Sequence, residues 1–213
     1  MSKLLQTKKN QVFFRLFLLL ISFVFPINLF AGSVCVKYDK VNGNGDFPFN
    51  FRVIDNKFCA GGTLFNPITK QGNSKLKVLD HLRMLKKMGV KTIITLNVPL
   101  TDKVTPLLSE LCEQEALEHI KIRMTANEIP NEHQTQLIMD RIENGAYVHC
   151  MWGCDRTGAI IAMYLRLKHN YSGEDAYKAV IKGGSHSGKM GGFKEIASNN
   201  KLIRYFWNNG IQF

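Results

Sequence analysis

This chain is poor in acidic residues and contains no internal repeat. It has 17 Asp and Glu residues against 28 Lys and Arg residues, so its formal net charge at pH 7 is +11. The lack of a fixed period excludes a solenoid or a propeller. A basic excess favours anionic substrates or surfaces, although solvated lysines on helix faces produce the same total. Charge alone therefore does not choose a partner, and we expect no nucleic acid.

Long apolar runs are also scarce, and the longest one lies near the N-terminus. Three lysines precede the run at 16–25, and small residues follow at 31–33. This order is typical of a secretory signal peptide, with cleavage expected after Ala31. The alternative is an uncleaved membrane anchor. It is less favoured because a spanning helix needs about 20 apolar residues, and this run is shorter and is interrupted by Pro26. Loss of residues 1–31 would leave 24 basic against 17 acidic residues, a net charge of +7. We expect an exported protein, either periplasmic or secreted.

Five cysteines are an odd number, which leaves at least one thiol outside any disulfide. An oxidising compartment permits disulfides, and by exclusion we expect Cys35 to pair with Cys59. Cys112 lies on a predicted helix and is expected to be a small buried hydrophobe.

Strands alternate with helices along most of the chain, which predicts an α/β fold. The predicted strands are 51–54, 57–60, 90–96, 119–124 and 146–149, and the predicted helices are 74–89, 105–118, 132–143, 159–165, 172–182 and 194–207. Leucines at helical spacing mark the first helix: Leu76, Leu79, Leu82 and Leu85. We expect a central, mostly parallel sheet flanked by helices on both faces, with ligands bound beyond the carboxyl ends of the strands. The expected organisation is a signal peptide at 1–31, a loose segment at 32–50 and one domain at 51–210.

The stretch 147–158 carries the predicted chemistry. It begins as an apolar strand, turns at Gly153 and enters a helix, and this order leaves backbone N–H groups pointing into an anion site. Cys150 would lie at the floor of the loop and Arg156 at its rim, where the helix dipole and the guanidinium favour the thiolate. The expected phosphate-binding residues are Met151, Trp152, Gly153, Cys154, Asp155 and Arg156.

These residues predict a two-step phosphate transfer. The thiolate attacks phosphorus in line, and water then hydrolyses the cysteinyl-phosphate. Arg156 and the amides neutralise the developing charge, so no metal or cofactor is expected. His149, Cys150 and Cys154 are too closely spaced to close a tetrahedral metal site alone. We expect His149 to orient the cysteine and Thr157 to donate its hydroxyl to the sulfur in the second step.

The sequence His149-Cys150, five further residues and then Arg156-Thr157-Gly158 resembles the active-site loop of the cysteine-based tyrosine and dual-specificity phosphatases. Residues 51–207 are similar in layout to the compact atypical dual-specificity phosphatases of bacteria, some of which carry export signals. The strand at 89–97 also resembles the Gly-hydrophobic-Lys-Thr strand of that family. The resemblance implies a dual-specificity phosphatase-like fold and a protein tyrosine or dual-specificity phosphatase.

The expected general acid departs from the family pattern. The family places an Asp on the loop before the helix that leads to the active-site strand, and here that position reads Asn127. Glu128 is adjacent and could protonate a leaving oxygen. Some bacterial phosphatases that end their loop in Asp-Arg-Thr-Gly are thought to use that Asp, so Asp155 is slightly favoured over Glu128. A catalytically impaired phosphate-binding module is the alternative from a different class.

The expected substrate is a phosphorylated protein or a small phosphorylated compound. Phosphotyrosine comes first and phosphoserine or phosphothreonine second, because Trp152 supplies an apolar wall and the loop lacks the lysines of phosphoinositide phosphatases. A Gly-rich stretch with His186 and Lys189 could close over a polyanion, so a phosphoinositide or inositol-phosphate phosphatase is the runner-up. A membrane surface is expected as a partner only under the lipid alternative. A reversible Cys150–Cys154 disulfide is a further hypothesis.

Overall fold

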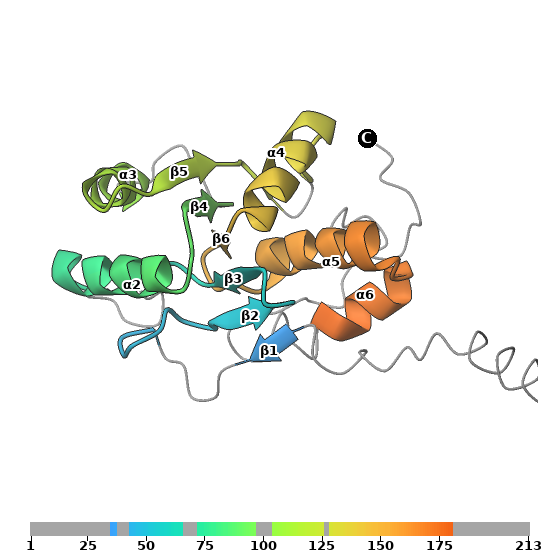
Figure 1. Ribbon diagram of the computed structural model, residues 1–213, viewed down its shortest axis with the longest axis horizontal. Helices are drawn as coiled ribbons and strands as arrows, with labels where there is room; N and C mark the ends of the chain where they lie inside the picture. The colour runs from blue at the N-terminus through green and yellow to red at the C-terminus, as the bar shows by residue number, and fades with distance from the viewer. Residues whose placement is uncertain (1–34, 38–42, 66–71, 97–103, 126–127, 181–213) are drawn as a thin grey trace, which may run out of the picture. The chain divides into compact units, whose positions relative to one another are not determined.

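A computed structural model describes residues 35–37, 43–65, 72–96, 104–125 and 128–180 (Figure 1). The predicted signal peptide, the Gly-rich stretch with His186 and Lys189, and the predicted last helix lie outside these residues. Within the described part of the chain, no helix has both the length and the apolar character that crossing a membrane requires.

A mixed sheet of six strands forms the centre of the fold, in the order β1-β2-β3-β6-β4-β5. The strands are β1 (Cys35–Lys37), β2 (Arg52–Ile54), β3 (Phe58–Gly61), β4 (Thr92–Thr95), β5 (Glu118–Lys121) and β6 (Ala146–His149). The pairs β3–β6, β6–β4 and β4–β5 are parallel, whereas β1 and β2 add to the β3 side as antiparallel strands. The expectation of a mostly parallel sheet is confirmed. The strand β1 falls in the segment that we expected to be loose.

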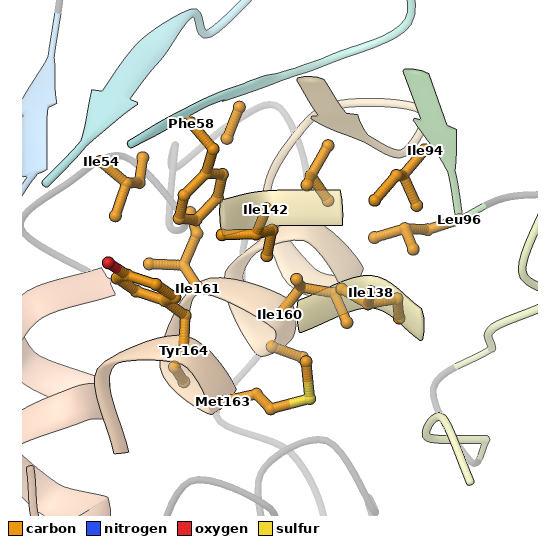
Figure 2. Close-up of a cluster of buried hydrophobic side chains, with 14 of the residues drawn as sticks. Ile54, Phe58, Ile94, Leu96, Ile138, Ile142, Ile160, Ile161, Met163 and Tyr164 are labelled. Atoms are coloured by element: carbon orange, nitrogen blue, oxygen red, sulfur yellow. The ribbon is translucent and has the colours of Figure 1, made fainter. Parts of the chain in front are cut away.

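Helices cover both faces of this sheet, as expected. They are α2 (Lys75–Lys87), α3 (Val104–Gln114), α4 (Glu132–Glu143), α5 (Asp155–His169) and α6 (Gly173–Val180). One apolar core joins α4, α5 and α6 to the sheet, and a second joins α2 and α3 to the opposite face (Figure 1). Figure 2 shows the first core, where Ile160 of α5 lies beside Ile138 of α4, and Tyr164 of α5 packs against Phe58 of β3. Residues 157–165 of α5 are all buried, so this helix is a central element and its first turn has a fixed position.

The apolar face of α2 differs from the predicted one at its start. Leu79, Leu82 and Leu85 are buried, but Leu76 is 73% exposed. Successive residues in a helix turn by about 100°, so leucines three apart drift around the axis by about 60° at each step. Leu76 therefore lies on the side opposite Leu85. Val78 takes its place in the core.

The helix predicted at 105–118 ends earlier, at Gln114. Ala116 has a φ of +53°, which breaks the helical path. The N–H of Leu117 then donates to the carbonyl of Cys112 at 2.8 Å. Glu118 starts β5 instead of ending the helix.

The predicted Cys35–Cys59 disulfide is wrong. Cys59 is a buried thiol, and burial raises its pKa to about 12. The physical reason is the strand order, because β2 lies between β1 and β3. Two strand spacings separate the backbones by about 9.6 Å, which exceeds the roughly 7 Å limit between Cα atoms of a disulfide.

An ion pair at the edge of the sheet predicts a pH-dependent contribution to stability. Both carboxylate oxygens of Glu118 accept from the guanidinium of Arg141, at 2.7 and 3.0 Å, and Thr92 donates to one of them at 2.8 Å. The bond from Arg141 holds the pKa of Glu118 below its usual range. A depressed pKa stabilises the fold above the unfolded value of about 4.3, and this contribution is lost as the pH falls through the folded value.

We therefore expect Glu118→Gln to lower the free energy of unfolding at pH 7 by about 0.5 kcal/mol, because the carboxylate is partly exposed. The difference from the parent should shrink below about pH 4. Urea denaturation at both pH values measures it, with Glu110→Gln, an exposed residue in the middle of α3, as the control. An equal loss at pH 7 and pH 3 would contradict the electrostatic explanation.

Candidate active site

The loop between β6 and α5 lies at the centre of the carboxyl edge of the parallel strands. Cys150 directly follows β6, which is flanked by β3 and β4, and α5 begins at Asp155. Cys150 is only 2% exposed, whereas Arg156 is half-buried. The strand end and the helix start therefore bring the predicted nucleophile and the predicted clamp into one loop.

Neighbouring segments hold two carbonyl groups of this loop, those of Met151 and Trp152. The backbone N–H of Thr63 donates to the carbonyl oxygen of Met151 at 3.1 Å. The side-chain amide of Asn50 donates to the carbonyl oxygen of Trp152 at 3.3 Å. Thr63 follows β3 and Asn50 precedes β2, so both donors come from the β2–β3 side of the loop.

The next carbonyl, that of Gly153, receives two donors. Nη2 of Arg52 donates to it at 2.7 Å, and the amide of Asn50 donates to it at 3.2 Å. Arg52 is completely buried, and Asn50 is 6% exposed. A hydrogen bond from a guanidinium is stronger than one between neutral groups. Gly153 therefore has the most firmly fixed carbonyl of the loop.

These three carbonyls determine where the N–H groups point. In a planar trans peptide, the C=O of one residue and the N–H of the next point in opposite directions. Carbonyls of residues 151, 152 and 153 that face the β2–β3 side turn the N–H groups of Trp152, Gly153 and Cys154 the other way. The loop thus presents consecutive donors on its inner side, as an anion site requires.

Gly153 is the residue that allows this turn. Its φ is +68°. A Cβ atom there would lie 2.3 Å from the carbonyl carbon of Gly61 and 2.6 Å from the nitrogen of Gly62. The loop therefore packs backbone to backbone on the end of β3, which only glycine permits. The turn predicted at this glycine is confirmed.

The N-terminus of α5 has no side-chain cap, unlike those of α2 and α4. Ser74 caps α2, and Asn131 forms a capping box with Gln134 on α4. Cys154 occupies the corresponding position of α5 and makes no side-chain cap hydrogen bond. Because the first N–H groups of a helix have no partner within it and carry a partial positive charge, a bound anion would cap this helix.

Arg156 is available to a ligand. Among the residues that the structure describes, its guanidinium forms no hydrogen bond and no ion pair. It lies in the first turn of α5, next to the uncapped N–H groups. A guanidinium carries five donors in a planar fork that matches two oxygens of a phosphate.

His149 lies where it can orient Cys150. The ring is 2% exposed and stacks on Tyr147, with 5.7 Å between the ring centroids. Its Nδ1 is 3.4 Å from the carbonyl oxygen of Cys150, and its Nε2 is 2.8 Å from Oγ1 of Thr95 on β4. The ring is thus held from the β4 side, which the sequence did not reveal.

The hydrogen bonds continue from Thr95 across the sheet. Its Oγ1 also lies 2.8 Å from Nε2 of His119, and Nδ1 of His119 lies 2.9 Å from Oγ of Ser109. Burial lowers the pKa of His119 to about 4, so this ring is neutral at pH 7. A continuous series of hydrogen-bonding groups thus runs from Ser109 through His119 and Thr95 to His149.

Two other loop residues have contacts on the outer side. The hydroxyl of Thr157, which is fully buried, donates to the carbonyl of Gly61 at 3.5 Å. The thiol of Cys154 donates to the carbonyl of Trp152 at 3.5 Å and accepts from Asn50 at 3.6 Å. Cys150 and Cys154 are both thiols, and a reversible bridge between them stays a prediction.

The two candidate acids lie in different surroundings. Asp155 is the first residue of α5, and its Oδ1 is shielded from solvent. The carboxylate of Glu128 is 45% exposed and lies 3.5 Å from Nε of Arg123. Glu128 follows β5, and β4 lies between β5 and β6. Asp155 therefore lies directly at the end of the loop, whereas the segment of Glu128 begins two strands away. Asn127 lies outside the described residues.

The rim of the loop is apolar. Met151 is 38% exposed. Trp152 is half-buried and packs edge-on against Phe49, with 5.9 Å between the ring centroids. In the part of the chain that the structure describes, no cluster of three His, Cys, Asp or Glu side chains could hold a metal ion.

The residues that hold the loop are not apparent from the sequence. Asn50 lies in the segment expected to be loose, and Thr95 and His119 lie in predicted strands with no sign of a further role. Arg52 gave a signal, because it is a charged residue between two apolar ones in a predicted strand. Nothing in the sequence indicated which backbone groups it would contact.

Comparison with solved structures supports the fold. The chain is similar to TpbA from P. aeruginosa, at 14% identity and a TM-score of 0.51, over 73% of this chain and 84% of that one. It is also similar to the catalytic core of the PP-IP phosphatase SIW14 from S. cerevisiae, at 15% identity and a TM-score of 0.50, over 77% and 88% of the two chains. No curated protein matches.

Comparison with protein families matches residues 63–198 to the family described as "PTP-SAK: Swiss Army Knife protein, DSP-PTPase phosphatase domain". This match spans more than half of the chain and includes the whole loop between β6 and α5. It agrees with the resemblance that the loop motif shows. The chain therefore belongs to this family of cysteine-based phosphatase domains.

Proposed function

We propose that this protein is an exported phosphatase that hydrolyses phosphate monoesters, phosphotyrosine first, through a cysteinyl-phosphate on Cys150. The observation that carries the proposal is the fixed orientation of the loop, whose carbonyls are held on one side and whose N–H groups face the other. The uncapped start of α5 and the available guanidinium of Arg156 support it.

In the first step, the thiolate of Cys150 attacks phosphorus, the S–P bond forms and the P–O ester bond breaks. The leaving oxygen takes a proton from Asp155, and Arg156 with the loop amides neutralises charge on the phosphoryl oxygens. In the second step, water attacks phosphorus and gives a proton back to Asp155. The S–P bond then breaks, and the Thr157 hydroxyl, after rotating away from Gly61, stabilises the released thiolate.

The shape of the rim favours an aryl phosphate. Cys150 is buried, whereas the next residue, Met151, is exposed, and the ring of Trp152 packs against Phe49. The ring of phosphotyrosine is long enough to carry the phosphate down to a buried sulfur, and its apolar faces suit an apolar rim. Phosphoserine and phosphothreonine esters are shorter and more polar, which makes them the weaker substrates. Inositol phosphates and phosphoinositides are the runner-up, because basic residues outnumber acidic residues in the chain that cleavage would leave.

Replacing the nucleophile tests the mechanism. Cys150→Ser should lower turnover of a small aryl phosphate by at least about a thousandfold, because the hydroxyl is a poor nucleophile, and should still bind inorganic phosphate. Steady-state kinetics and calorimetry measure the two effects. Cys112→Ser is the matched control, since Cys112 is a buried thiol whose pKa burial raises to about 12. Turnover by Cys150→Ser at the parent rate would rule out the mechanism.

The same assay, run on phosphotyrosine peptides, phosphoserine peptides, phosphoinositides and inositol phosphates, decides the substrate class. We expect the highest kcat/KM for phosphotyrosine peptides. A higher value for an inositol phosphate would make the runner-up correct, and phosphate binding without any turnover would indicate a binding module.

Substitution of the two candidate acids assigns the proton donor. Asp155→Asn should lower kcat for phenyl phosphate, whose leaving group needs a proton, by roughly 10²- to 10⁴-fold. It should lower kcat much less for p-nitrophenyl phosphate, whose leaving group is stable as an anion. Glu128→Gln should leave kcat for both substrates unchanged. If Glu128→Gln lowers kcat for phenyl phosphate and Asp155→Asn does not, Glu128 is the proton donor.

Export is proposed from the N-terminal pattern alone. Expression of the full chain in a Gram-negative bacterium, followed by N-terminal sequencing of protein from outside the cytoplasm, should give a chain that starts at Gly32. Recovery only from the membrane fraction with residues 1–31 intact would favour the anchor.

A further inference from the structure

We propose that Arg52 is a positioning residue for the phosphate loop and that it keeps the Gly153 carbonyl turned away from the bound anion. This inference rests on the proposed function. Arg52 lies before residues 63–198, the part of the chain that matches the family, so the family assignment does not include it.

The strand order explains how Arg52 reaches the loop. β2 runs antiparallel to β3, so its first residue lies at the edge where β3 and β6 end. In the register, Arg52 pairs with Ala60, and Ala60 pairs with Val148, two residues before Cys150. Side chains alternate between the faces of a strand, so Arg52 shares the face of Ile54, which is the face that α5 covers. The guanidinium therefore extends along that face toward the start of α5.

The guanidinium ties two segments together. Nη2 donates to the carbonyl of Gly153 at 2.7 Å, and Nη1 donates to the carbonyl of Asn50 at 3.0 Å. The amide of Asn50 then donates to the same Gly153 oxygen at 3.2 Å. Because a carbonyl oxygen has two lone pairs, these two donors occupy both and hold the peptide in one orientation.

The loop needs this restraint because glycine offers little of its own. Glycine has no Cβ atom and tolerates several backbone conformations, so the peptide between Gly153 and Cys154 can rotate at low steric cost. Rotation would turn a carbonyl oxygen toward the phosphate and remove the N–H of Cys154 from it. Both changes weaken binding of an anion.

Packing alone does not account for a fully buried guanidinium. Taking a charge out of water is costly, and an apolar side chain of similar volume often gives equal or greater stability. A positive charge behind the loop also favours a bound phosphate, which is negatively charged. The contact with Gly153 and the sign of the charge both serve anion binding.

The test uses Arg52→Met and Arg52→Lys, each made in the parent and in Cys150→Ser. Calorimetry with inorganic phosphate on the Cys150→Ser proteins measures anion binding without turnover. Arg52→Met should weaken phosphate binding by roughly 10- to 100-fold, the loss expected for one hydrogen bond to a charged group. In the parent, the same change should lower kcat for an aryl phosphate. Arg52→Lys keeps the charge and one donor, and it should recover part of both.

Two further variants separate positioning from stability. Asn50→Ala removes the second donor to the Gly153 carbonyl and should weaken phosphate binding less than Arg52→Met does. Tyr164→Phe removes a 2.6 Å hydrogen bond to Asp55, away from the loop, and should lower Tm without changing phosphate affinity. If Arg52→Met fails to fold, Arg52→Lys and Asn50→Ala decide the question.

Unchanged phosphate affinity and kcat in Arg52→Met would overturn the inference. If Arg52→Met does not fold, the same result in both Arg52→Lys and Asn50→Ala would overturn it. A lower Tm with unchanged affinity would overturn it too. If Cys150→Ser with Arg52 intact binds no phosphate and the parent shows no turnover, the proposed function itself fails and the inference fails with it. An active parent with an unaffected Arg52→Met overturns the inference alone.

Discussion

Donors from the segments that flank β2 and β3 hold the carbonyls of residues 151–153, and the arrangement of the active edge depends on these bonds. With the carbonyls fixed on the β2–β3 side, the planar peptides turn their N–H groups to the other side. Gly153 allows the loop to lie directly against Gly61 and Gly62. The orientation of the loop N–H groups is therefore set by restraint of the backbone, and Arg156 lies beside them in the first turn of α5.

The order of the strands supplies this restraint from both sides. β6 lies between β3 and β4, so the loop has a neighbour on each flank. On one flank, Asn50, Arg52 and Thr63 hold its carbonyls. On the other, Thr95 holds His149, and His149 contacts the carbonyl of Cys150. Behind the loop, α5 is buried along 157–165, which fixes the first turn of the helix where an anion would cap it.

The buried cysteines lie in two kinds of surroundings. Cys59 and Cys112 lie in the core between α2, α3 and the sheet, where burial raises the pKa of each thiol to about 12. Cys150 is as buried, but it lies beside an uncapped helix start and an available guanidinium. Burial is therefore common to these three thiols, and the neighbouring helix start and guanidinium distinguish the surroundings of Cys150.

The sequence by itself determined the helix at 132–143, the strand at 146–149, the mostly parallel sheet and the loop with Cys150, Gly153 and Arg156. These features depend on local periodicity, turn chemistry and a contiguous motif, which a linear sequence records. Tertiary structure alone decided that Cys35 and Cys59 lie too far apart to bond, because β2 separates their strands. It also decided that Arg52 and Thr95 hold the active loop, since their partners lie about 100 and 54 residues away. Such contacts arise only when the sheet order places distant segments at one edge.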